Sequence, residues 1–141
     1  ERYGWHEDKV EGTYKCYKSV ECIMPGVHDF TKFLKRGYGR GTDFAAQDRR
    51  AGILTREEAN KIVREYDPAE PDVLDYYLEI TGYARDEFYH IMDKHREKLG
   101  ILTREEIQAA MDDYRRNFGD RPKERTHIRP ERVERLKGGK G

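Results

Sequence analysis

The sequence is poor in apolar residues and in cysteine, and it lacks any long hydrophobic run. Hydrophobic residues make up 35% of its 141 positions and charged residues 40%, so the chain can bury only a modest core. No stretch approaches the roughly 20 apolar residues of a membrane-spanning helix, and no charged-then-apolar leader is present. The low apolar content fits either a thin single domain or a piece that completes its core against another domain.

Metal-binding and catalytic patterns are also missing. Cys16 and Cys22 are separated by five residues, which is not a common zinc spacing, and without signs of secretion we expect the reduced cytoplasm. His90 and His95 project from different sides of a helix. Residues 47–58 have the length of an EF-hand loop, but calcium needs oxygen ligands at the first, third and fifth positions, which are Gln47, Arg49 and Ala51. We therefore predict neither a metal site nor a catalytic residue in this chain.

What the chain does contain is a repeat, GILTREE, at residues 52–58 and 100–106. In each copy the glycine can adopt a positive φ and end the preceding helix. The threonine is placed to cap the next helix, and the second glutamate can reach back to the cap N–H as a capping box. The leucine before the threonine can pack as a hydrophobic staple. The repeat therefore predicts two helix–turn–helix hairpins.

Hydrophobic periodicity predicts an all-α fold with few strand signals. We expect helices near residues 27–36, 42–50, 55–66, 72–80, 85–98 and 103–117. The segment GYGRG, residues 37–41, is expected to be a loop because three glycines in five residues break a helix. The apolar sides of the fourth and fifth helices are expected to contain Val73, Leu74, Tyr77, Leu78 and Ile80, and Phe88, Ile91, Met92 and His95.

Charge is balanced overall, but from Arg121 onward there are eight Lys/Arg residues against three Asp/Glu. Such a basic end can dock on nucleic acid or an acidic membrane surface, although a solvated, poorly ordered tail is the favoured interpretation, and a nucleic-acid partner is not expected. We accordingly predict an irregular lead-in (residues 1–26), a helical domain (residues 27–117) and a basic flexible tail (residues 118–141).

The GYGRG loop is the best candidate for an anion site. Backbone N–H groups bared by glycine, together with a fork-shaped guanidinium, can accept a phosphate, and the alternative is a flexible corner with solvated neighbours. Cations gather in the sequence around this loop: Lys32, Lys35, Arg36, Arg40, Arg49 and Arg50. His28 and Asp29 are adjacent in sequence, but neighbours on a helix are not expected to face each other, so we expect a packed or exposed histidine there.

Four segments between Tyr3 and Arg96 read YGWHEDKVEGTY, HDFTKFLKRGYGR, DRRAGILTREEA and DEFYHIMDKHR. Together they resemble the C-terminal part of bacterial N-acetyl sugar amidotransferases of the PP-loop ATPase type. The resemblance implies an enzyme that activates the N-acetyl group of a nucleotide sugar with ATP and Mg. Ammonia from partner glutaminase subunits would then give an acetamidino group for lipopolysaccharide O-antigen or a related glycan.

The phosphate-binding SGGxDS string and the cysteine pairs of that family are absent from this sequence, which begins at Glu1 rather than at methionine. We therefore expect the C-terminal part of such an enzyme, without its ATPase domain and not catalytic alone. Carried onto this sequence, the resemblance implies four basic residues that could close over a phosphate or nucleotide sugar: Lys32, Arg40, Arg50 and Arg56. It also implies two supporting residues, Asp48, which would hold one of the arginines, and His28.

The resemblance offers no counterpart for the second GILTREE hairpin or for the tail after Asn117. A rival interpretation is a free-standing helical module that binds a protein through its duplicated hairpins, with the basic tail as an anchor. A domain that normally packs on an enzyme should expose a contiguous aromatic face around Phe30, Tyr38 and Phe44, beyond the few hundred Å² usual for monomers. A free-standing module should not.

Overall fold

The computed structural model describes residues 11–15 and 22–119 of the chain. Within these ranges there is no strand, and the helices are α1 (Pro25–Arg36), α2 (Arg40–Arg50), α3 (Arg56–Tyr66), α4 (Val73–Thr81), α5 (Arg85–Leu99) and α6 (Arg104–Phe118). None of these helices is long and apolar enough to cross a bilayer. The all-α prediction is confirmed, and every predicted helix is present with its ends within two residues of their expected positions. The tail from residue 120 onward and most of the lead-in lie outside the described residues.

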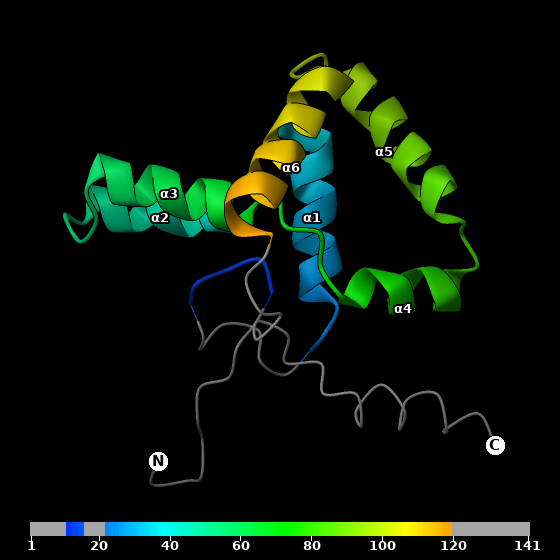
Figure 1. The fold of residues 1–141 in the computed structure, drawn as a ribbon, viewed down its shortest axis with the longest axis horizontal. Helices are drawn as coiled ribbons and strands as arrows, with labels where there is room; N and C mark the ends of the chain where they lie inside the picture. Colours follow the sequence, from blue (N-terminus) through cyan, green and yellow to red (C-terminus); the bar gives the residue numbers. More distant parts are fainter. Residues whose placement is uncertain (1–10, 16–21, 120–141) are drawn as a thin grey trace, which may run out of the picture.

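The core is built around α1, which stands between the other helices (Figure 1). Its buried apolar residues are Val27, Phe30, Phe33 and Leu34. The residues of α4, α5 and α6 that join the same cluster are Val73, Leu74, Phe88, Ile107 and Met111. Since each fully buried apolar side chain contributes roughly 1.5–3 kcal/mol, this cluster is the main source of cohesion among these four helices.

The expected aromatic face is wrong in one of its members. Phe30 is buried in the core, where its ring meets that of Tyr89 edge-on with centroids 6.4 Å apart. Tyr38 is exposed and Phe44 is half-buried, so these two rings alone remain available near the α1–α2 corner. The spacing of apolar residues along α1 could not predict that Phe30 is buried while Tyr38 and Phe44 are not, because the position of α5 decides which side of α1 is covered.

The two GILTREE copies form the same capping box, but the helix before it ends differently, because Ala51 is the C-cap of α2 whereas Gly100 is the C-cap of α5. Gly52 and Gly100 have φ of 74° and 61°. In each copy the threonine hydroxyl accepts from the glutamate N–H at 3.2 Å, and the glutamate carboxylate accepts from the threonine N–H at 2.8 Å. Both predicted capping boxes are therefore confirmed.

The packing that follows each turn differs between the copies. Helices α2 and α3 lie side by side as a hairpin, whereas α5 packs on α1 and α6 on α3. In Figure 1, α5 and α6 diverge from their shared turn. The second predicted helix–turn–helix is present, with its turn and its capping box, but α5 and α6 pack on different neighbours rather than on each other. The GILTREE sequence forms the same capping box in both copies, but α5 packs against α1 and α6 packs against α3.

Substituting either capping threonine with alanine is expected to lower the free energy of unfolding by about 1 kcal/mol, because the glutamate N–H loses its acceptor. The effects of Thr55→Ala and Thr103→Ala should be similar and can be measured by urea unfolding. Thr81→Ala is the matched control, since its hydroxyl donates to the Tyr77 carbonyl of its own helix at 2.8 Å and caps nothing. A control effect as large as the other two would contradict the capping explanation.

Two residues on the predicted apolar sides are exposed, namely Ile80 on α4 and His95 on α5. The buried position in this part of α5 is instead Arg96, whose Nη1 donates to the Leu34 carbonyl at 2.8 Å. A charged residue at a buried position is invisible to a periodicity argument, because its burial depends on an acceptor supplied by another helix.

Candidate functional site

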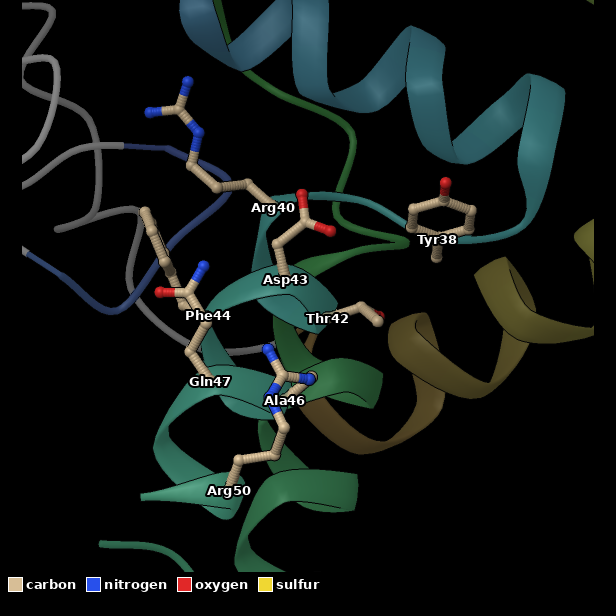
Figure 2. Close-up of a pocket in the computed structure, with 8 residues that line it drawn as sticks. All are labelled: Tyr38, Arg40, Thr42, Asp43, Phe44, Ala46, Gln47 and Arg50. Atoms are coloured by element: carbon tan, nitrogen blue, oxygen red, sulfur yellow. The ribbon is translucent and has the colours of Figure 1, made fainter.

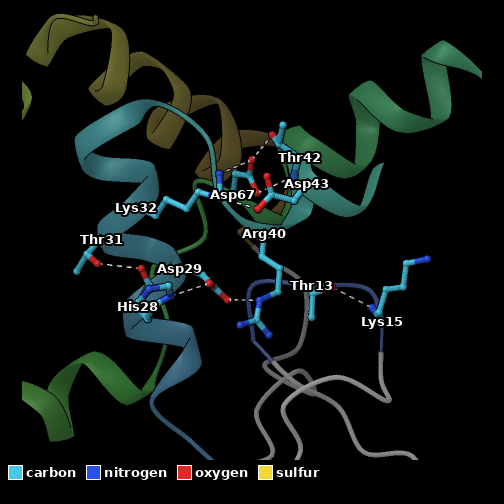
Figure 3. Close-up of polar contacts among 11 residues, drawn as sticks. Thr13, Lys15, His28, Asp29, Thr31, Lys32, Arg40, Thr42, Asp43 and Asp67 are labelled. Carbon is cyan, nitrogen blue, oxygen red and sulfur yellow. Dashed lines mark hydrogen bonds and ion pairs between the residues drawn. The ribbon is translucent and has the colours of Figure 1, made fainter. Parts of the chain in front are cut away.

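The corner between α1 and α2 is organised around the buried carboxylate of Asp67, which follows α3. The Gly39 N–H donates to its Oδ2 at 2.9 Å, and the Thr42 N–H donates to its Oδ1 at 3.3 Å (Figure 3). The Thr42 hydroxyl and the Gly41 N–H are further donors. Burial raises the pKa of Asp67, and these hydrogen bonds oppose the rise. Asp67 thus satisfies the first free N–H groups of α2, the function usually performed by a cap residue.

This arrangement corrects the interpretation of GYGRG as a bare phosphate cradle. The N–H groups expected to bind a phosphate already donate hydrogen bonds to the Asp67 carboxylate. The expected loop is also shorter than residues 37–41, because α2 begins at Arg40. A Cβ on Gly39 or Gly41 would lie 2.9 or 2.6 Å from Asp67 Oδ1. These glycines are therefore needed for the close approach of a carboxylate, and nothing in the sequence pattern connected them with a residue so far along the chain.

Arg40 is held by Asp29 rather than by Asp48. Its Nε lies 2.8 Å from Asp29 Oδ2, while His28 Nδ1 lies 3.2 Å from Oδ1 of the same carboxylate (Figure 3). Burial raises the pKa of Asp29, and the charges of Arg40 and His28 oppose the rise. The expectation that His28 and Asp29 would not face each other is wrong, because the aspartate turns toward the histidine as well as toward Arg40.

Asp48 contacts residues of the lead-in. It accepts from the Tyr14 hydroxyl at 2.5 Å and lies 2.8 Å from Lys15 Nζ. Hydrogen bonds from Lys15 and Tyr14 lower the pKa of Asp48. Asp48 therefore does not hold an arginine of the site, as expected, but fastens residues 11–15 to α2.

A groove of about 660 Å³ runs along the outer face of α2 (Figure 2). Its lining residues are Tyr38, Arg40, Thr42, Asp43, Phe44, Ala46, Gln47 and Arg50. Positions 40, 43, 47 and 50 are spaced by three or four residues and so share one face of the helix. The volume lies within the range of small-molecule sites. Sequence reasoning missed Tyr38, Asp43, Phe44 and Gln47 as lining residues, although helical spacing from Arg40 would have found the last three.

The four basic candidates are distributed unevenly around this groove. Arg40 and Arg50 line it, but the Arg40 guanidinium points away toward Asp29 (Figure 2). Lys32 does not line the groove, but its Nζ lies 2.5 Å from Oδ2 of Asp43, which does. Arg56 lies beyond the α2–α3 turn and does not line the groove. Arg50 is exposed and has no ion pair within the described ranges, so of the candidates that line the groove it is the one whose guanidinium is open to an anion.

The groove presents several groups that can contact a ligand. It combines two aromatic rings, a carboxylate, a carboxamide, a hydroxyl and an open guanidinium. No lining residue is a histidine, a cysteine or a lysine that could act as a nucleophile. Across the part of the chain that the structure describes, no group of three or more His, Cys, Asp or Glu side chains could hold a metal ion.

Comparison with known proteins gives one informative result. Neither the curated proteins nor the solved structures include a significant match to this chain. A family model described as the C-terminal domain of WbpG-like LPS biosynthesis proteins matches residues 11–136. The match includes the second GILTREE copy, for which the sequence resemblance had offered no counterpart, as well as α1 to α6 and the α2 groove. Since it extends over most of the sequence, the chain belongs to the family of the C-terminal domain of WbpG-like LPS biosynthesis proteins.

Proposed function

We propose that this chain is the helical C-terminal part of an ATP-dependent N-acetyl sugar amidotransferase, and that it binds the nucleotide-sugar substrate. In that reaction ATP with Mg would adenylylate the acetamido oxygen with release of pyrophosphate. Ammonia from glutaminase subunits would then displace that oxygen as AMP to give an acetamidino group. A PP-loop ATPase domain outside this sequence supplies the ATP chemistry, so the chain is not catalytic alone. The place of action is the cytoplasm, where ATP and nucleotide sugars are available. Membership of an LPS biosynthesis family supports a glycan substrate.

The observation that carries the proposal is the α2 groove with the open guanidinium of Arg50 at one end. A guanidinium binds phosphate oxygens in a fork geometry with charge-assisted hydrogen bonds. Tyr38 and Phe44 offer ring surfaces for a base or a sugar. The contribution of the groove to the reaction is to position the substrate, while the reacting groups come from the ATPase domain.

Arg50→Ala in the complete enzyme is expected to weaken nucleotide-sugar affinity about tenfold, which corresponds to about 1.4 kcal/mol and to the loss of one hydrogen bond from a charged group. The dissociation constant can be measured by calorimetry, with circular dichroism to verify the fold. Arg49→Ala is the matched control, because Arg49 is the preceding exposed arginine of α2 and does not line the groove. Equal losses in both variants, or no loss in Arg50→Ala, would contradict the assignment.

The second candidate function is a protein-binding module, and one observation favours it. Ile53 and Ile101, at equivalent positions of the two GILTREE turns, are 69% and 58% exposed. Neither isoleucine is needed for the turn or the cap, which use the glycine, threonine and glutamate. If Arg50→Ala leaves nucleotide-sugar affinity unchanged, a function based on these two turns becomes the better account of the domain.

A further inference from the structure

One wall of the α2 groove is built from Lys32, Tyr38 and Asp43. The Lys32 ammonium lies 2.5 Å from Asp43 Oδ2 and 4.6 Å from the centroid of the Tyr38 ring. It therefore fixes the carboxylate and covers one face of the ring. The Asp43 side chain is 44% exposed, and no donor among the described residues reaches its Oδ1. Oδ1 and the uncovered part of the ring are thus both available within the groove.

Stability alone does not account for this wall. A partly exposed ion pair such as Lys32–Asp43 contributes little to folding, and Tyr38 leaves 37% of its surface in water. An aromatic ring beside a carboxylate acceptor suits a ligand with an apolar face and several hydroxyl groups, because the ring contacts C–H groups and the carboxylate accepts from O–H. Sugar rings combine these two features.

The spacing along α2 places a phosphate site on the same face. Arg50 follows Asp43 by seven residues, which is two helical turns and about 10 Å along the axis. Figure 2 shows the Arg50 side chain running back along the helix toward the level of Gln47, which shortens the distance between its guanidinium and Asp43. Lys32 offsets the Asp43 charge, so an acidic group in the groove does not repel a phosphate held at Arg50.

We propose that Tyr38 and Asp43 form a sugar subsite, in which the ring of a phosphorylated sugar lies against Tyr38 and its hydroxyls donate to Asp43. The phosphate attached to that ring binds Arg50, and Lys32 is a positioning residue that orients Asp43. The ligand class rests on the proposed function. The shared chemistry is a ring with neighbouring hydroxyls that carries a phosphate ester, which a nucleotide sugar offers twice, in its pyranose and in its ribose.

The test uses the 141-residue chain and titration calorimetry with four probes. These are UDP-N-acetylglucosamine, N-acetylglucosamine 1-phosphate, UDP and inorganic pyrophosphate, and only the last lacks a ring. Asp43→Ala is expected to weaken binding of UDP-N-acetylglucosamine about tenfold and to leave pyrophosphate binding unchanged. Arg50→Ala should weaken both. Asp112→Ala, which removes an exposed aspartate on α6, is the matched control and should change neither.

The probes also identify which ring occupies the subsite. If Asp43→Ala also weakens binding of N-acetylglucosamine 1-phosphate but not of UDP, the subsite holds the pyranose; if it also weakens binding of UDP but not of N-acetylglucosamine 1-phosphate, the subsite holds the ribose. Both outcomes support the proposal. If Asp43→Ala changes no ring-containing ligand while Arg50→Ala weakens them, the sugar subsite is wrong and the proposed function stands. If the unaltered chain binds none of the four probes, the sugar subsite and the substrate-binding role of the groove are both overturned.

Discussion

Replacing Arg96 with alanine is expected to lower the free energy of unfolding by about 3–5 kcal/mol, the cost typical of breaking a buried ion pair by removing one partner. Arg96 is 2% exposed and lies on α5 where that helix packs against α1. Its Nη1 donates to the Leu34 carbonyl at 2.8 Å, and its Nη2 pairs with Asp93. The guanidinium therefore joins the last turn of α1 to the last turn of α5.

Two consequences of the substitution add together. Alanine leaves the Leu34 carbonyl without its Arg96 donor and leaves Asp93 with Arg104 alone, 3.6 Å away, and an unsatisfied buried polar group is costly. It also leaves a cavity where one of the largest fully buried side chains of the described residues had been. Because small domains are stable by only about 5–15 kcal/mol, this one change should remove a large part of the total.

Arg104→Ala is the matched control for this prediction. Arg104 contacts the same carboxylate, with its Nε 3.6 Å from Asp93 Oδ2, but its side chain is 77% exposed. Its removal should change the free energy of unfolding by no more than about 0.5 kcal/mol. Urea unfolding of the two variants checks both values. If the two losses are similar, the buried guanidinium is not what fastens α5 to α1.

Asp67→Ala is expected to cost about 3 kcal/mol, because buried N–H donors at the start of α2 lose their acceptor and each such loss costs about 1–3 kcal/mol. The residues affected are Gly39, Gly41 and Thr42. Urea unfolding measures the cost, and amide hydrogen exchange should show the loss of protection at Gly39 and Thr42. Unchanged protection at these amides would show that the carboxylate does not cap the helix.

A double-mutant cycle with Gly39→Ala gives a sharper test of the same contact. A Cβ at Gly39 would lie 2.9 Å from Asp67 Oδ1 and makes no other approach closer than 3.2 Å. Gly39→Ala should therefore destabilise the unaltered protein and be nearly neutral when Asp67 is already alanine. Contacting residues couple in this way, whereas distant ones add. Additive effects would mean that the glycine is needed for a reason other than the carboxylate.

The candidate site could be predicted only in part from the sequence. Clustering of basic residues identified Arg40 and Arg50, which line the groove. Arg56, predicted as a further phosphate ligand, does not line it, and Asp48, predicted to hold an arginine, contacts Tyr14 and Lys15 instead. The phosphate cradle inferred from glycine spacing is filled by Asp67, which lies 28 residues from Gly39. Glycine frequency indicates that something approaches the backbone closely, but the sequence does not say whether it is a ligand or another part of the protein.

What the sequence determined by itself is local. The helices, the positive-φ glycines and both capping boxes depend on residues within three or four positions of one another, so their energetics are nearly complete in a short segment. What only the tertiary structure decided depends on residues far apart. Arg96 is buried because Leu34, 62 residues away, offers a carbonyl. Helices α5 and α6 separate after a turn that has the same capping box as the turn between α2 and α3. Such contacts form only when the whole core is assembled, since no local segment contains both partners.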